Sequence, residues 1–289
     1  MPSELRSVNL RTGITVPCLI QRPADVRAPT GSGASDVNHA PPLLLLHAWG
    51  ESRKSFGRLL PLLPPSFTVL APDLRGQGGA DKPEDGYSLA QMADDVAALL
   101  EALGVASACV LGSSSGGYVA QQLAVDRPEL VDSLILVGAP LSLHSRPAFA
   151  AEVEKLDDPV DEQWVRDSLS WFQLLHTVPA WYIEDRVQDG VAMPARAWKG
   201  ILDGLCDAVP PTEQGSISVP TLILWGAHDA LLPRSHQETL AARIPGAQLV
   251  IYGATGHIVL WECPERIAED VAVFLGKGPG TGSVPKNQA

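Results

Sequence analysis

The sequence predicts an α/β fold with a mostly parallel central sheet and helices on both faces. Short apolar runs alternate along the chain with segments whose apolar residues recur at helical spacing, as in strands joined by covering helices. The chain has 289 residues, of which 45% are hydrophobic and 19% charged. This length and balance suit one large globular domain with an inserted subdomain, stable without disulfides.

The apolar runs that we expect to form strands are short and bounded by turn residues. Their continuous apolar character is typical of central strands that are buried on both faces. They are residues 15–20, 43–47, 67–71, 108–112, 133–137, 221–225 and 248–252.

Two helices have clear end signals. The first lies between Ser88 and Leu103, where Ser88 and Gln91 form a capping-box pattern and Gly104 provides a stop. The second should begin near Pro264, which suits a first helical position. Its expected buried face consists of Ile267, Val271 and Phe274.

Other segments interrupt the regular alternation. Residues 24–42 are rich in Pro, Gly, Ser and Ala and predict a flexible surface loop, and the polar residues 277–289 predict a flexible tail. Residues 141–218 instead contain helical patterns and four of the seven tryptophans. We interpret this stretch as a helical cap inserted into a core made of residues 1–140 and 219–276.

Composition disfavours several classes of function. The 33 acidic residues exceed the 21 basic ones and give a formal net charge of -12, which repels nucleic-acid backbones and anionic membranes. No apolar run is long enough to span a membrane, and the N-terminus lacks a secretory pattern, so we expect a cytoplasmic protein. The four scattered cysteines indicate neither a metal site nor a disulfide framework. The oligomeric state stays open, with a homodimer among the options.

The segment 110–117 carries the strongest chemical signal. An apolar strand runs there into G-x-S-x-G and then into a helical pattern. A nucleophile at such a sharp turn needs small residues two positions before and two positions after it, so Gly112 and Gly116 select Ser114. G-x-S-x-G also occurs in ordinary turns, so its interpretation depends on a base and an acid elsewhere in the chain.

Candidates for both follow in the chain order Ser, Asp, His. Asp229 follows the strand predicted at 221–225, and His257 follows the one at 248–252, so both side chains can reach the sheet edge where Ser114 lies. Singly, Asp229 could be a loop acid or helix cap and His257 a structural residue. The combination favours Ser114 as nucleophile, His257 as general base and Asp229 as the acid that orients it. We assign His47 a structural or solvent-exposed role.

An oxyanion hole should come from two backbone N–H groups. One belongs to Ser115, the residue after the nucleophile, and the other to the loop after the strand at 43–47. Trp49 or Ala48 provides that second group, and the Trp49 side chain also suits a pocket wall.

These motifs resemble those of the α/β-hydrolase superfamily over nearly the whole chain. Residues 43–50 resemble the family's apolar strand followed by H-G-x-x, residues 71–78 its D-x-R-G-x-G turn, and residues 112–117 its nucleophile elbow. Ala48 and Ala80 depart from the family's usual glycine and serine. A serine at the elbow, where haloalkane dehalogenases and epoxide hydrolases carry aspartate, argues against both of those activities.

The resemblance implies an α/β-hydrolase fold and cleavage of a carboxylic ester or lactone through an acyl-enzyme on Ser114, without a metal or organic cofactor. The expected partner is a small to medium apolar substrate. Carbon-carbon bond hydrolysis, cofactor-free peroxidase or oxygenase chemistry and a ligand receptor with negligible turnover stay open as alternatives. The residues expected to line the substrate site are Trp49, Trp164, Trp171, Trp181 and Trp198.

Overall fold

The computed structural model describes residues 3–23 and 41–276. It contains an eight-stranded sheet with the order β1-β2-β4-β3-β5-β6-β7-β8, in which β1, β2 and β4 pair antiparallel and the remaining neighbours pair parallel. This arrangement confirms the predicted fold class. Nearly all of the predicted loop at 24–42 and the whole predicted tail at 277–289 lie outside the described residues. The strands are β1 (Ser3–Asn9), β2 (Thr15–Gln21), β3 (Leu43–Leu46), β4 (Val69–Pro72), β5 (Ala108–Ser113), β6 (Val131–Val137), β7 (Thr221–Gly226) and β8 (Gln248–Tyr252).

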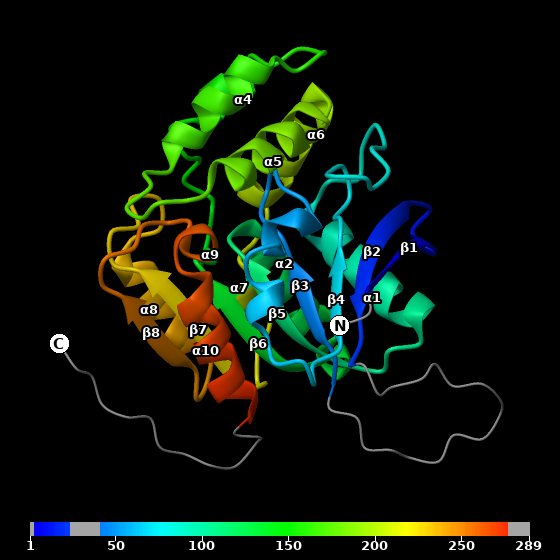
Figure 1. Cartoon of the computed structure of the whole chain (residues 1–289), viewed down its shortest axis with the longest axis vertical. Helices are drawn as coiled ribbons and strands as arrows, with labels where there is room; N and C mark the ends of the chain where they lie inside the picture. The colour runs from blue at the N-terminus through cyan, green and yellow to red at the C-terminus, as the bar shows by residue number, and fades with distance from the viewer. Residues whose placement is uncertain (1–2, 24–40, 277–289) are drawn as a thin grey trace.

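Each predicted strand is present, with ends shifted by a residue or two. Successive side chains of β3 face opposite sides, so Leu44 packs with one hydrophobic cluster while Leu43 and Leu45 pack with the other. Helices α1 (Leu89–Leu103) and α2 (Ser115–Asp126) cover the first face. Helix α10 (Pro264–Gly276) covers the second. The central strands β3, β4, β5 and β7 are therefore buried on both faces (Figure 1).

The end signals of the predicted helices match the structure. The Ser88 side chain accepts a hydrogen bond from the Gln91 N–H at 3.2 Å, and Gly104 ends α1 in the left-handed region at φ 67°. Helix α10 begins at Pro264, as predicted. Two further helices lie beside the last two strands, α8 (Arg234–Arg243) and the short α9 (Val259–Glu262).

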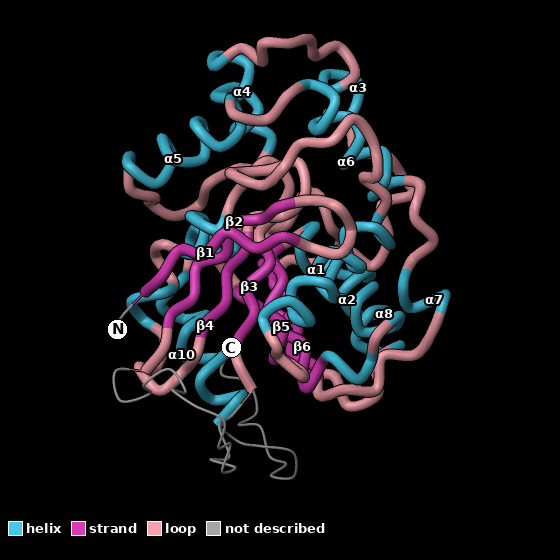
Figure 2. The backbone as a smooth tube through the Cα atoms, turned by 90° about the vertical axis from the view of Figure 1, so that its right-hand side faces the viewer, coloured by secondary structure: helices cyan, strands magenta, loops and turns pink. Residues whose placement is uncertain are grey.

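The stretch between β6 and β7 holds α3 (Ala150–Val153), α4 (Glu162–Ser168), α5 (Ala180–Val191), α6 (Ala195–Cys206) and α7 (Pro211–Gln214). We call residues 141–218 the insert. Figures 1 and 2 show α4, α5 and α6 stacked beyond one edge of the sheet, while α7 lies beside α2. A short 3-10 helix, η1 (Arg53–Phe56), follows β3 below the insert. No helix in the described part of the chain is long and apolar enough to cross a membrane.

Candidate active site

Ser114 lies at the turn between β5 and α2. Its φ of 48° and ψ of -118° make it the one described non-glycine residue with a positive φ. Such a conformation is strained for a side chain with a Cβ and is found mainly where surrounding structure enforces it. The Ser114 side chain shares a cavity with residues of the insert, as expected of a nucleophile elbow.

The glycines around Ser114 permit a close backbone approach. A Cβ on Gly112 would overlap the Gly116 carbonyl, and a Cβ on Gly116 would overlap the Leu46 carbonyl and lie 2.5 Å from the His47 oxygen. Neither glycine has a positive φ, so both are required for space rather than for backbone conformation. The predicted need for small residues on both sides of Ser114 therefore has a direct steric cause.

The structure brings Ser114, His257 and Asp229 together. The Ser114 Oγ lies 3.0 Å from the His257 Nε2, and the His257 Nδ1 lies 2.8 Å from the Asp229 Oδ2. Because a carboxylate only accepts, His257 donates its Nδ1–H to Asp229, and its Nε2 is left as the acceptor for the Ser114 hydroxyl. The side chains of His257 and Asp229 are almost fully buried.

Backbone groups fix the Asp229 carboxylate. Its Oδ1 accepts the N–H groups of Leu231 at 2.8 Å and Leu232 at 2.9 Å, which leaves Oδ2 for His257. The loops after β7 and β8 touch closely, since a Cβ on Gly226 would overlap the Gly256 carbonyl. The loops after β7 and β8 thus pack together and hold Asp229 next to His257.

Both predicted oxyanion residues lie beside Ser114. The N–H of Ser115 has no acceptor among the described residues, as is usual in the first turn of a helix. The N–H of Trp49 is engaged, because it donates to the Ser115 Oγ at 2.6 Å. The Trp49 amide is therefore present at the site but is not free in the resting protein.

His47 fixes the loop that carries Trp49. It is wholly buried, its Nε2 accepts the Leu74 N–H at 2.9 Å, and its Nδ1 donates to the Ala48 carbonyl at 2.8 Å. Burial lowers the pKa of His47, while the Asp73 carboxylate and the hydrogen bond to Ala48 act in the opposite direction. His47 therefore stays neutral and structural, consistent with one of the two roles predicted for it.

A cavity lies between Ser114 and the insert. Its lining is mostly apolar, with aromatic rings from the core and from the insert. Sequence reasoning missed several lining residues because no local motif marks them. These are Phe149, Phe172, Leu202, Leu205, Ile258 and Trp261.

The predicted tryptophans divide into two groups. Trp49, Trp171 and Trp198 line the cavity. Trp164 does not line it and packs edge-on behind it, with ring centroids 5.5 Å from Trp171 and 5.4 Å from Trp198. Trp181 also lies outside the cavity lining, is 55% exposed, and contacts Tyr182. The structure therefore does not bring Trp164 or Trp181 into the cavity wall.

Aromatic rings also surround His257. Phe172 stacks on the imidazole with centroids 5.2 Å apart, and Phe149 stacks on Trp171 at 4.6 Å. The same rings and His257 also line a second pocket, which includes His228 and Gln173. Each ring comes from the insert, so the insert shields the serine-histidine pair from solvent.

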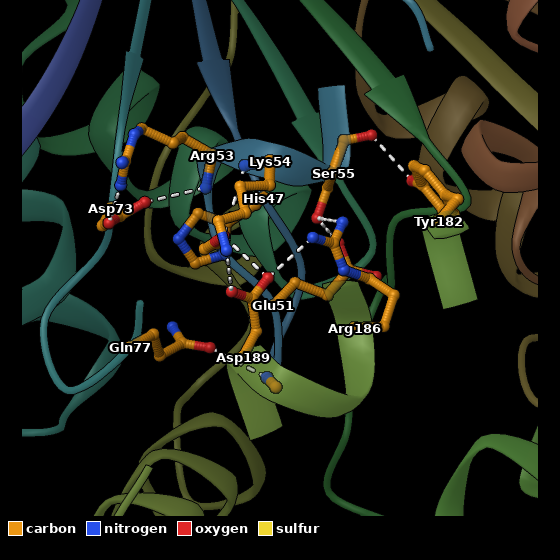
Figure 3. Close-up of polar contacts among 12 residues, drawn as sticks. His47, Glu51, Arg53, Lys54, Ser55, Asp73, Gln77, Tyr182, Arg186 and Asp189 are labelled. Carbon is orange, nitrogen blue, oxygen red and sulfur yellow. Dashed lines mark hydrogen bonds and ion pairs between the residues drawn. The ribbon is translucent and has the colours of Figure 1, made fainter. Parts of the chain in front are cut away.

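A buried polar network joins the insert to the core below it (Figure 3). Arg186 of α5 donates to the Ser55 Oγ at 2.9 Å and to the Asp189 Oδ2 at 2.7 Å. The Glu51 carboxylate accepts from Ser55 and, at 2.8 Å, from the Trp261 Nε1. Arg186 and Glu51 also line the cavity and bring a guanidinium and a carboxyl group to its wall. No local motif predicts this network, because its members come from distant segments of the chain.

Comparison with known proteins supplies the family. A family model described as alpha/beta hydrolase fold matches residues 41–184 and 192–264. The chain belongs to the α/β-hydrolase superfamily. The resemblance inferred from the motifs is thereby confirmed.

Relatives and a solved structure agree with this family. A 2-hydroxymuconate semialdehyde hydrolase of Pseudomonas putida is 31% identical over 222 residues, covering 72% of this chain and 77% of the relative. A pimeloyl-[acyl-carrier protein] methyl ester esterase of Neisseria meningitidis is 31% identical over 248 residues, covering 81% and 92%. A hydrolase of Pseudomonas aeruginosa PA01 has a similar structure, with a TM-score of 0.77, 26% identity, and coverage of 94% and 98%.

Proposed function

We propose that this protein is a serine hydrolase that cleaves a carboxylic ester or lactone of a small to medium apolar substrate. One observation carries the proposal. An unbroken hydrogen-bonded chain from Asp229 through His257 to Ser114 lies beside a mostly apolar cavity. The relative named as a methyl ester esterase supports the same reaction class.

The mechanism follows from the donors and acceptors already described. The Ser114 Oγ attacks the substrate carbonyl while His257 Nε2 takes the hydroxyl proton, and the negative charge moves to the carbonyl oxygen. Asp229 stabilises the resulting imidazolium and holds the ring. When the carbon-oxygen bond to the leaving group breaks, His257 passes the proton to the departing oxygen. Water then repeats the cycle and releases the acid.

The insert acts as the lid that selects the substrate. Its rings at Phe149, Trp171 and Trp198 form a large part of the apolar wall, and Phe172 covers the imidazole of His257. A dry, apolar wall favours alkyl or aryl groups and strengthens the electrostatic interactions of the reacting atoms.

Carbon-carbon bond hydrolysis is a second candidate, favoured by one feature of the cavity. Arg186 lines it, and the buried Arg186 Nε has no hydrogen-bond partner among the described residues. A carboxylate-bearing substrate would find a donor there, and one relative is named as a 2-hydroxymuconate semialdehyde hydrolase. Against this candidate, the Arg186 charge is already paired with Asp189 at 2.7 Å.

Covalent labelling tests the proposed function. A fluorophosphonate should form one adduct whose peptide maps to Ser114, since the reagent mimics the tetrahedral intermediate. Ser114→Ala should abolish labelling and lower ester turnover by about four orders of magnitude or more while the fold is retained. Neighbouring Ser113 should remain unlabelled. Full ester turnover in Ser114→Ala would contradict the proposal.

A substrate panel separates the two candidates. The kcat/KM values for a series of apolar esters should be compared, under identical conditions, with the kcat/KM for an unsaturated diketone that carries a carboxylate. We expect the esters to be the better substrates. A diketone acid that outperforms every ester, and that depends on Arg186, would instead support carbon-carbon bond hydrolysis.

A further inference from the structure

Glu262 is a buried carboxylate that the proposed mechanism does not use. It is the last residue of α9, it follows His257 by five positions, and it is only 5% exposed. A buried carboxylate needs hydrogen-bond donors to replace the water that it has lost. Glu262 obtains its donors from two segments, one in the insert and one in the loop 253–257, which we call the histidine loop.

The two oxygens of the Glu262 carboxylate contact different segments. Oε1 accepts the N–H groups of Leu175 and of His176, the latter at 3.1 Å, whereas Oε2 accepts the Gly256 N–H at 3.2 Å. The first two residues belong to the insert, and Gly256 directly precedes His257. Hydrogen bonds from an N–H group to a carboxylate are stronger than those between neutral groups. One side chain therefore fastens the insert to the histidine loop.

Two further contacts join the same segments. His176 donates its Nε2–H to the Ala254 carbonyl at 2.8 Å, since a carbonyl only accepts. A Cβ on Gly256 would lie 3.1 Å from the Gln173 carbonyl oxygen, so the two backbones are in close contact there. Residues 172–176 of the insert are therefore docked on the histidine loop by hydrogen bonds as well as by packing.

This docking bears on the position of the His257 ring. Asp229 holds the ring at Nδ1, 2.8 Å away, but a single hydrogen bond does not fix its tilt. The backbone of the histidine loop and the stacked ring of Phe172 constrain what is left. Transfer of the Ser114 proton needs Nε2 within hydrogen-bond distance, where it lies at 3.0 Å. A misplacement of about 1 Å can lower a rate by about 100-fold.

We propose that Glu262 is a positioning residue that couples the insert to the general base. Its carboxylate is not part of the cavity lining, so it acts through His257 rather than on the substrate. The inference rests on the proposed function, because only proton transfer between Ser114 and His257 depends on the position of this ring. It gives the insert a second role beside forming the apolar wall, since the docked insert also holds the base in place.

Glu262→Gln removes one of the two attachments at nearly constant side-chain size. The amide oxygen can accept from the insert or from Gly256, but the NH2 group then meets the other segment donor to donor. We expect kcat for an ester to fall by about 10-fold, with KM within about twofold of wild type because the cavity wall is unchanged. The rate of labelling by a small fluorophosphonate should also fall, since labelling needs the same proton transfer.

Glu265→Gln is the matched control. Glu265 lies in the first turn of α10, three positions after Glu262, but its side chain is 66% exposed. It should keep the kcat and KM of wild type. All kcat values are expressed per fluorophosphonate-reactive site, so that a loss of folded protein does not count as a loss of turnover.

His176→Ala tests the same docking from the side of the insert and decides the question if Glu262→Gln does not fold. His176 is exposed, so removal of its ring breaks the contact with the Ala254 carbonyl at little cost in packing. We expect kcat to fall by about fivefold at unchanged KM. His144→Ala is its control, because His144 is another exposed histidine of the insert, whose ring has no hydrogen-bond partner among the described residues.

Two results would overturn the inference. One is a kcat within about twofold of wild type for Glu262→Gln, or for His176→Ala where the first variant does not fold. The other is an equal loss in the matched control, which would mean that the docking is not the cause. Labelling of the wild-type protein keeps the two proposals apart. Absence of a Ser114 adduct contradicts the proposed function, whereas normal labelling together with an unchanged kcat in Glu262→Gln contradicts only the positioning role.

Discussion

Single residues explain why the candidate site needs a particular backbone. Ser114 occupies a strained conformation, and the glycines on both sides allow β5, α2 and the loop after β3 to meet at van der Waals distance. The motif G-x-S-x-G could be predicted from the sequence because its glycines answer a local steric demand. The Ser115 to Trp49 hydrogen bond could not, since it joins residues 66 positions apart and depends on a side-chain rotamer.

His47 yields a prediction about pH. Burial lowers its pKa in the folded protein, whereas in the unfolded chain a histidine titrates near ~6.5. A depressed folded pKa means that the unfolded state takes up the proton first, so the stability associated with His47 is present above about pH 6.5 and is lost as the pH falls. Wild type should therefore have a lower urea midpoint at about pH 5.5 than at about pH 7.5.

His47→Gln isolates this contribution. Glutamine can still accept the Leu74 N–H, but it does not titrate. We expect the variant to have a lower urea midpoint than wild type at about pH 7.5. At about pH 5.5 the difference between the midpoints of the variant and the wild type should be smaller. Other groups that titrate in this range cancel in the comparison. A gap of constant size across the two pH values would show that His47 is not protonated on unfolding.

At the scale of elements, the accuracy of sequence prediction depended on burial. The central strands and α1 have continuous or periodic apolar patterns, and the structure places them nearly where the sequence predicted. Besides the four-residue α9, two longer elements without such a pattern were missed. β1 is an edge strand with exposed Leu5 and charged neighbours, and α8 buries only Gln237 and Leu240. Edge and surface elements owe their structure to tertiary pairing, which a local pattern does not encode.

The insert shows the same limit for side chains. Its helical character could be predicted, yet the sequence could not tell which tryptophans face the cavity, because that depends on how α4, α5 and α6 pack. The structure separates Trp171, which lines the cavity, from Trp181, which is exposed on α5. This separation provides a matched pair for testing the role of the insert.

Trp171→Ala should change the substrate profile, and Trp181→Ala should not. Removal of the Trp171 ring opens space in the apolar wall, so kcat/KM for long acyl chains should rise relative to short ones by about 10-fold. Trp181→Ala should keep the wild-type ratio within about twofold. The measurement is kcat/KM over a series of esters of increasing acyl length. Identical profiles in both variants would mean that the insert does not select the acyl group.

At the scale of the whole molecule, the insert and the core are joined by buried charge as well as by apolar packing. Arg186 reaches from α5 to Ser55 in η1, and the Tyr182 hydroxyl donates to the Ser55 carbonyl at 2.7 Å. Asp189 balances the arginine and also accepts from the Ser52 hydroxyl at 2.7 Å. These contacts fix α5 of the insert to η1 and to the loop that follows Trp49, so the geometry of the candidate site depends on them.

Breaking this network should be costly because both charges are buried. The side chains of Arg186 and Asp189 are only 1% and 5% exposed. Arg186→Met leaves the buried Asp189 carboxylate with a single charged neighbour, the half-exposed Lys54 ammonium at 3.8 Å, and we expect it to lower the free energy of unfolding by about 3 kcal/mol. Replacing both partners, with Arg186→Met and Asp189→Leu, should recover most of that loss, because no unpaired charge remains buried.

Arg166→Met is the matched control for this comparison. Arg166 also lies in the insert and also contacts two acids, Glu162 at 2.6 Å and Glu184 at 2.8 Å, but its side chain is 37% exposed. Exposed ion pairs contribute little, so its removal should cost less than about 1 kcal/mol. Urea unfolding of the four proteins, followed by tryptophan fluorescence, measures the differences. Equal losses for Arg186→Met and Arg166→Met would mean that burial of the Arg186 pair adds nothing, and that apolar packing alone holds the insert over Ser114.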